Sequence, residues 1–150
     1  MIEAPSRGRG KSARSIRLVR AARDMTRGVG ELLKIPAQRV LVASTGVIGM
    51  PFPIDKVKSA LPKLVKSLSP KGGRLAAEAI MTTDSVPKAF SKKVKLSSGQ
   101  ACVTGIAKGA GMIRPDMATM LGFIATDAGY PRRRLQEVLE RVADRSFNCI

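Results

Sequence analysis

The residues best suited to chemistry lie in the stretch KGAGMIRPDMATMLGFIATDA, residues 108–128. This stretch begins with a glycine-rich turn, passes a second turn at Pro115 and Asp116, and presents Thr119 just before an apolar run. A threonine hydroxyl is a weak nucleophile unless a base lies beside it. Cleavage of the peptide bond before Thr119 would supply that base, because a free α-amine has a pKa of roughly 7.7–8.0. Taken alone, the pattern favours the simpler interpretation, a β-branched residue that starts a strand.

The chain contains no histidine. That absence excludes Ser-His-Asp and Cys-His catalysis, and it excludes zinc sites built on imidazole. A nucleophile in this chain therefore needs a lysine, a carboxylate or an α-amine as its base. The sequence predicts no metal site.

Three other polar segments could contribute to a site. Lys108 lies in a glycine-rich turn that lacks the full phosphate-binding P-loop pattern, so it could equally hold a carboxylate. Thr82, Thr83 and Asp84 form a polar cluster at an element boundary, where they could simply cap a helix or strand. Small residues at 44–49 could let backbone N–H groups approach a ligand, or could form an ordinary turn. Each signal is weak by itself.

The net charge of +16 is the strongest signal in the composition, and alone it points to nucleic acid or an anionic surface. Much of the charge is local, because residues 1–30 hold eight basic side chains against two acidic ones. We therefore expect residues 1–21 to form a basic, disordered arm. The alternative is a small nucleic-acid-binding protein, although aromatic residues, at 3%, are scarce for base stacking.

The two cysteines, Cys102 and Cys149, are most simply reduced thiols. No apolar run approaches the roughly 20 residues that a membrane span requires, and the N-terminus lacks the apolar region of a secretory signal. We therefore predict a cytoplasmic protein with no membrane partner.

The order of periodic segments predicts a mixed α/β (α+β) chain. Helical spacing is expected at 21–33, at 54–68 with a break at Pro62, at 74–80 and from Pro131 onward. The valine-rich run at 39–44 and the apolar run at 120–125 predict buried strands, and 88–96 with 100–107 predict a hairpin.

Three motifs in this order, LVASTGVIG, IMTTDSVPK and KGAGMIRPDMATMLGFIATDA, resemble the glutamate N-acetyltransferase / ornithine acetyltransferase family of arginine biosynthesis. The similarity runs from about Ala22 to Ile150. It implies an α/β fold with layered sheets flanked by helices, of the self-cleaving type that resembles N-terminal nucleophile hydrolases.

The resemblance also implies an activity. Family members cleave themselves at the bond that matches Ala118–Thr119, which yields an α and a β chain. The new N-terminal residue, Thr119, then takes an acetyl group from N-acetylornithine and passes it to glutamate. Some members also use acetyl-CoA as a donor, and no other cofactor is implied. The expected assembly is a hetero-oligomer with two α and two β chains.

Four further positions match the family's site. Thr45, through its hydroxyl, and Gly46, through its backbone N–H, match the oxyanion hole. Thr82 and Lys108 match residues that contact the substrate. A lysine is chemically suitable there, because the substrates carry a free carboxylate.

Three features depart from the family. Residues 1–21 are more basic than the family's longer N-terminal region, Asp116 stands where asparagine is common, and the family's β chain continues far beyond Ile150. We expect a truncated enzyme with an α part at 22–118 and the start of a β chain at 119–150. That second piece has 32 residues, below the roughly 40 at which a chain folds unaided. An inactive fragment is therefore the remaining alternative.

Overall fold

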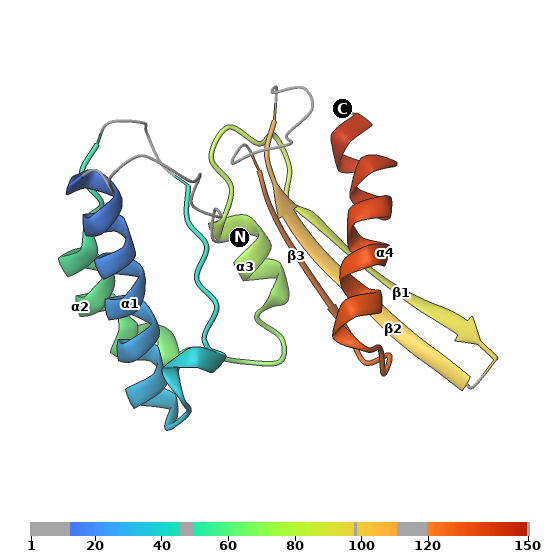
Figure 1. Ribbon diagram of the computed structural model, residues 1–150, viewed down its shortest axis with the longest axis horizontal. Coiled ribbons are helices and arrows are strands. Elements are labelled where there is room, and N and C mark those ends of the chain that lie inside the picture. Colours follow the sequence, from blue (N-terminus) through green and yellow to red (C-terminus); the bar gives the residue numbers. More distant parts are fainter. Residues whose placement is uncertain (1–12, 46–49, 98, 111–119, 150) are drawn as a thin grey trace. The chain divides into compact units, whose positions relative to one another are not determined.

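The computed structural model describes residues 13–45, 50–97, 99–110 and 120–149. The contacts divide the chain into two compact units, Met1–Ser69 and Pro70–Ile150. Figure 1 shows the order of the elements, with helices in the first unit and both helices and strands in the second. The predicted mixed α/β class is confirmed, because helices accompany an antiparallel sheet of three strands.

The first helix, α1, spans Ala13–Leu33. It begins eight residues earlier than predicted, so our expectation of disorder is wrong for residues 13–21. Alanine and arginine are both strong helix formers, and they dominate this segment. The helix ends in a Schellman motif: Lys34 has a φ of +55°, and the Ile35 N–H donates to the Gly30 carbonyl at 2.9 Å.

The short 3-10 helix η1, Ala37–Arg39, follows α1. The strand predicted at 39–44 is not formed: residues 40–45 have no regular structure, and Leu41 is 94% exposed. A valine-rich run becomes a strand only when another strand supplies backbone partners. No segment in the described part of the chain pairs with this one.

The helix α2, Ile54–Lys66, packs against α1. Pro62 lies inside this helix. The break predicted at Pro62 does not occur, although proline has no N–H to donate to the carbonyl of Lys58. Leu61 is buried, and a Cβ added at Gly28 would lie 2.8 Å from its Cδ1 atom. The absence of a side chain at Gly28 therefore lets α1 and α2 approach closely.

The second unit begins with α3, Gly73–Ala79, followed by β1, Lys88–Leu96, and β2, Gly99–Lys108. The helix at 74–80 and the hairpin are confirmed. The strands pair antiparallel with Ser91 opposite Thr104, and α3 packs on both of them. Ala77 of α3 and Ala101 of β2 are both buried.

The third strand, β3, spans Leu121–Thr126 and pairs antiparallel with β2, giving the order β1-β2-β3. The helix α4, Arg132–Asp144, and the 3-10 helix η2, Phe147–Cys149, complete the unit. Pro131 is the N-cap residue of α4 rather than its first helical residue.

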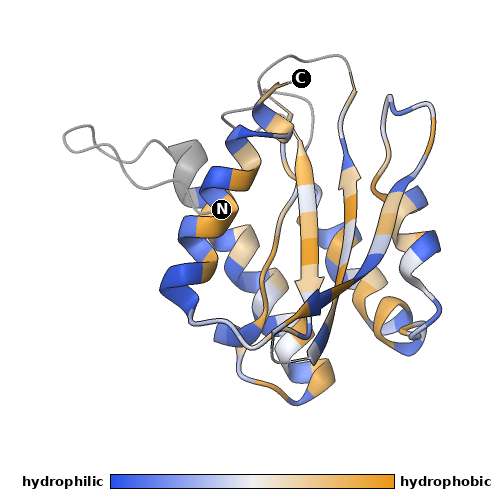
Figure 2. Ribbon diagram, turned by 90° about the vertical axis from the view of Figure 1, so that its right-hand side faces the viewer, coloured by the Kyte–Doolittle hydropathy of each residue, from blue (hydrophilic) through white to orange (hydrophobic). Residues whose placement is uncertain are grey.

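Apolar side chains recur along the strands and helices (Figure 2), yet many of them are exposed. The strand predicted at 120–125 exists, but it is not buried, with Ile124 at 52% exposure. The apolar stripe of α4 is also accessible, since Leu135 and Val142 are 46% and 48% exposed. Strand propensity is local, whereas burial needs a covering layer, and the described residues do not supply one for these positions.

Candidate active site

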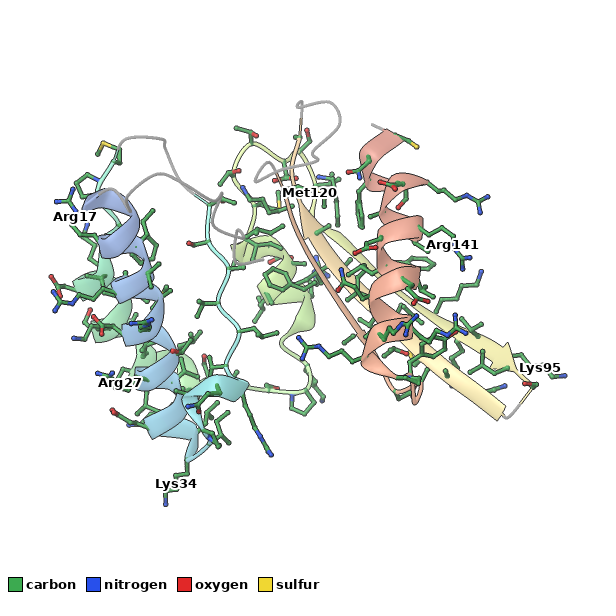
Figure 3. The ribbon with its side chains drawn as sticks, in the orientation of Figure 1. Arg17, Arg27, Lys34, Lys95, Met120 and Arg141 are labelled. Carbon is green, nitrogen blue, oxygen red and sulfur yellow. The ribbon has the colours of Figure 1, made fainter. Side chains whose placement is uncertain are left out.

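The last residue of β2 is Lys108, opposite Leu121 of β3. Lys108 is buried, with only 7% of the residue exposed. Gly109 follows with a φ of +143°, a conformation that favours glycine. A Cβ added there would lie 2.9 Å from the Cβ atom of Met120, which Figure 3 labels near the start of β3. The backbone at Gly109 therefore lies directly against Met120, the residue that follows Thr119 in the sequence.

Thr82 lies in the connection between α3 and β1, far from Lys108 in the sequence. The Lys108 ammonium donates a hydrogen bond to the Thr82 hydroxyl, with 3.2 Å between Nζ and Oγ1. The structure thus brings together two residues that the sequence singled out as a substrate-contacting pair.

Asp84 anchors both of these segments. Its side chain is 1% exposed. Its Oδ1 atom accepts from the backbone N–H of Gly109 at 2.8 Å and from the Lys88 ammonium, and its Oδ2 atom accepts from the N–H of Thr82 at 3.3 Å. A buried carboxylate is tolerated when donors surround it in this way.

These donors keep Asp84 ionised. Together these contacts lower the pKa of Asp84 from its ordinary value of 3.8 to about 2. The hydrogen bond from Lys88 is the largest cause, the backbone N–H groups of Gly109 and Thr82 act in the same direction, and burial opposes them by raising the pKa. The carboxylate is therefore negative at neutral pH.

The two lysines of the cluster have different electrostatic roles. Lys88 forms an ion pair with Asp84. Lys108 donates to a neutral hydroxyl, and none of the residues that the structure describes gives it a carboxylate partner. Other basic residues are solvated, and Figure 3 shows Lys34 and Lys95 extending away from the ribbon. A buried ammonium without a counter-ion favours an incoming anion, and a carboxylate fits it well.

The remaining predicted residues are not assembled into this cluster. Thr45 lies in the first unit, exposed, at the end of the irregular segment 40–45. Gly46, Ala118 and Thr119 lie outside the described residues. Of the predicted site, the structure therefore places Thr82 and Lys108 together.

Sequence reasoning missed the role of Asp84. It treated Thr82, Thr83 and Asp84 as a polar cluster that could cap an element, and it read Lys108 separately. The available signal was an acidic residue two positions after a threonine and four before a lysine, Lys88, at the start of a strand. What the sequence could not show is that Gly109, from a distant segment, supplies the third donor.

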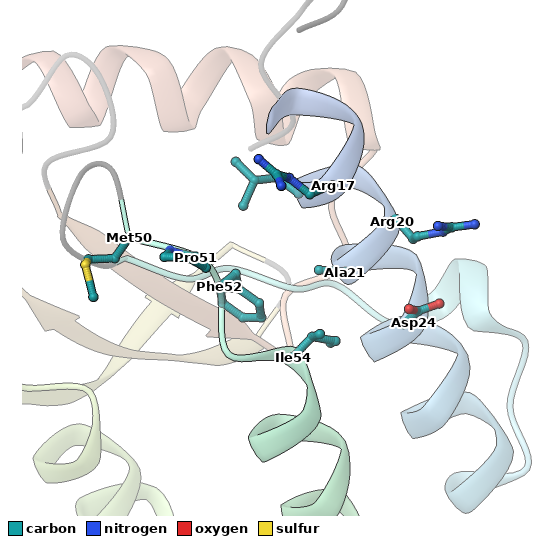
Figure 4. A pocket seen from close by; sticks show the side chains of 9 residues that line it. Arg17, Arg20, Ala21, Asp24, Met50, Pro51, Phe52 and Ile54 are labelled. Atoms are coloured by element: carbon teal, nitrogen blue, oxygen red, sulfur yellow. The ribbon is translucent and has the colours of Figure 1, made fainter. Parts of the chain in front are cut away.

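A separate pocket of about 270 Å³ lies in the first unit. Figure 4 shows it between α1 and the segment that leads into α2, with Ala21, Phe52 and Ile54 among its apolar side chains and Arg17 and Asp24 among its charged ones. None of the residues predicted for the site lines this pocket.

The search for metal ligands found no group of three or more suitable side chains among the described residues. Both cysteines are free thiols. Within the same residues, every helix is too short or too polar to cross a membrane.

The antiparallel sheet and its packed helix define a mixed α/β protein, in which the buried Lys108 contacts the Thr82 hydroxyl. Comparison with known proteins is consistent with that class. The model of the ArgJ family matches residues 15–150, so the chain belongs to the ArgJ family. The resemblance to glutamate N-acetyltransferase / ornithine acetyltransferase is thereby confirmed.

Two curated relatives show how much of the family this chain contains. It is 51% identical over 129 residues to the arginine biosynthesis bifunctional protein ArgJ of Methylococcus capsulatus, covering 86% of this chain and 32% of that protein. It is 46% identical over 132 residues to the protein of the same name from Symbiobacterium thermophilum, covering 88% and 33%. The chain therefore spans about a third of the length of these relatives.

A solved structure supports the fold. The crystal structure of the arginine biosynthesis bifunctional protein ArgJ from Bacillus halodurans matches with a TM-score of 0.57 and 31% identity. The match covers 74% of this chain and 55% of the other. Similarity at this level extends the family assignment from sequence to fold.

Proposed function

We propose that the chain carries the nucleophilic part of an acetyltransferase that moves an acetyl group from N-acetylornithine to glutamate. The observation that carries the proposal is the contact between the ammonium of the buried Lys108 and the Thr82 hydroxyl, at 3.2 Å, within a segment that matches the ArgJ family. Lys108 would bind the substrate carboxylate, and the Thr82 hydroxyl would orient it. Acetyl-CoA is a second donor for glutamate in this proposal.

The reaction begins with hydrolysis of the Ala118–Thr119 bond. This step consumes one water, leaves a carboxylate on Ala118 and frees the α-amine of Thr119. That amine, with a pKa of roughly 7.7–8.0, can accept the proton of the Thr119 hydroxyl. The oxygen then attacks the acetyl carbonyl of N-acetylornithine, and the protonated amine returns the proton to the departing nitrogen of ornithine.

The second half repeats these steps in reverse. The amine of glutamate attacks the acetyl ester on Thr119, its proton passes to the α-amine, and the Thr119 hydroxyl is restored. In both halves the tetrahedral intermediate carries an oxyanion, for which the Thr45 hydroxyl and the Gly46 N–H are the proposed donors. Loss of one such donor typically costs about 2.7–4 kcal/mol of transition-state stabilisation.

The same proposal covers the organisation of the protein. Residues 22–118 would contribute to an α chain and residues 119–150 to the start of a β chain. Two chains of each kind would assemble in the cytoplasm. The exposed apolar residues of β3 and α4, such as Ile124 and Leu135, suit such an assembly, because apolar residues grouped at a surface often contact further protein.

The test is an acetyl-transfer assay on the purified chain with N-acetylornithine and glutamate, measuring N-acetylglutamate. Thr119→Ala should abolish both cleavage and transfer. Thr82→Ala should raise the KM for N-acetylornithine about tenfold, a typical effect of losing one hydrogen bond to a charged group. Thr83→Ala is the matched control, because it makes the same change at the next residue, which is exposed as Thr82 is. Absence of product with the unaltered chain would mean that these residues do not form an active enzyme by themselves.

A further inference from the structure

Three segments of the second unit meet at the carboxylate of Asp84. The connection after α3 supplies the Thr82 N–H at 3.3 Å, the residue after β2 supplies the Gly109 N–H at 2.8 Å, and the start of β1 supplies the Lys88 ammonium. Two of the three donors are backbone groups. The contacts therefore fix the path of the main chain, whatever side chains it carries there.

The fixed positions are those from which the substrate-binding side chains depart. The Thr82 N–H belongs to the residue whose hydroxyl faces Lys108, and the Gly109 N–H belongs to the peptide bond that follows Lys108. Both amides bind the same carboxylate, on opposite oxygens. One carboxylate therefore holds the backbone next to both side chains whose atoms, Lys108 Nζ and Thr82 Oγ1, lie 3.2 Å apart.

We infer that Asp84 is a positioning residue for the Lys108–Thr82 pair: it aligns the ammonium and the hydroxyl so that both face one carboxylate of the substrate. The identity of that substrate rests on the proposed function. The positioning itself rests only on the described contacts.

The charge balance supports this role. If Asp84 paired with Lys108, it would neutralise the cation that the substrate needs. Instead Asp84 pairs with Lys88, whose side chain is 44% exposed. The ammonium of Lys88, which is partly exposed to solvent, thus balances the charge of the buried Asp84, and no carboxylate among the described residues pairs with Lys108.

Two variants of the 150-residue chain separate positioning from ion pairing. Asp84→Asn keeps the shape but leaves only one oxygen acceptor, so the N–H of Thr82 or of Gly109 must lose its partner. Lys88→Gln keeps the carboxylate and both backbone bonds and removes only the cation. Both variants are built on Thr119→Ala, so that neither cleavage nor turnover intervenes.

The first readout is hydrogen exchange of individual amides. In Asp84→Asn the amide of Thr82 or of Gly109 should exchange at least tenfold faster, whereas Lys88→Gln should change both less than threefold. The Cys102 amide, bound to Asp127 at 2.6 Å, is the internal control and should not change in either variant. Wild-type exchange rates at both Thr82 and Gly109 in Asp84→Asn would overturn the inference.

The second readout is the Kd for N-acetylornithine, measured by NMR titration. Asp84→Asn should raise this Kd about tenfold, and Lys88→Gln less than threefold. Adding Asp84→Asn to Thr82→Ala should have a smaller effect than Asp84→Asn alone, because the two changes act on one contact.

The two readouts fail separately. If Thr119→Ala does not bind N-acetylornithine while the two amides still depend on Asp84, the proposed substrate is wrong and the positioning stands. If N-acetylornithine binds and Asp84→Asn leaves its Kd unchanged, the positioning role is wrong and the proposed function stands.

Discussion

Replacing Gly109 by alanine should destabilise the second unit more than the same change at Gly99. Gly109 follows the last residue of β2 and Gly99 is its first residue, and their φ values are nearly equal, at +143° and +139°. An alanine in this conformation is strained by about 1–3 kcal/mol at either site. The strain, and the reduced freedom of the unfolded chain, therefore cancel when the two variants are compared.

The surroundings of the added methyl group differ. At Gly109 it would lie 2.9 Å from the Cβ atom of Met120, whereas at Gly99 no atom of the described residues outside the chain neighbours lies within 4 Å. Both atoms in the close contact are attached directly to the main chain, so neither can rotate away. Overpacking of this kind costs about 1–3 kcal/mol. Gly109→Ala should accordingly lower the free energy of unfolding by about that much more than Gly99→Ala.

Urea unfolding followed by tyrosine fluorescence measures this difference. The chain has one tyrosine and no tryptophan, and Tyr130 lies in the second unit, so the signal reports on that unit. The midpoint and slope give the free energy of unfolding for each variant. If the two variants lose the same free energy of unfolding, or Gly99→Ala loses more, the close packing of Gly109 on Met120 is refuted.

Two other predictions concern stability. The pKa of Asp84 falls from 3.8 to about 2 on folding. Its contribution to stability should therefore be complete above pH 3.8 and should be lost as the pH falls toward 2. Urea titrations across this range should show the loss in the unaltered chain and a weaker pH dependence in Asp84→Asn. Leu61→Ala should cost about 2–5 kcal/mol because Leu61 is buried between α1 and α2, whereas Leu64→Ala, at a 56% exposed position on the same helix, should change the free energy of unfolding by less than about 0.5 kcal/mol. Thermal melts of the two leucine variants make that comparison, and equal melting temperatures would argue against the described helix packing.

Local sequence patterns predicted most helices and strands correctly, but they did not predict which strands are paired or buried. The helix at 74–80 and the hairpin of β1 and β2 could be read from spacing and turn residues, because those signals are local. The strand predicted at 39–44 does not form, because strand formation depends on a contact that is not local. Its valines favour a strand, but strand formation depends on a partner strand, and the sequence of the run says nothing about that partner.

In the site, too, individual residues could be singled out from the sequence, but the contact that connects distant segments could not. The motif resemblance singled out Lys108 and Thr82, and the structure places their side chains 3.2 Å apart. The carboxylate that fixes them was visible only as a polar residue near an element boundary. Its importance comes from the Gly109 N–H, 25 residues away in the sequence, and no local pattern encodes such a contact.

The most direct test of the central claim is the mass of the peptide that begins at Thr119. The chain is incubated with N-acetylornithine that carries an isotopic label in its acetyl group, without glutamate, and is then analysed by mass spectrometry. The account predicts cleavage after Ala118 and a 32-residue product, residues 119–150, with the labelled acetyl group on Thr119. A single intact species of 16.0 kDa without label would contradict the assignment of Thr119 as a self-released nucleophile in this chain.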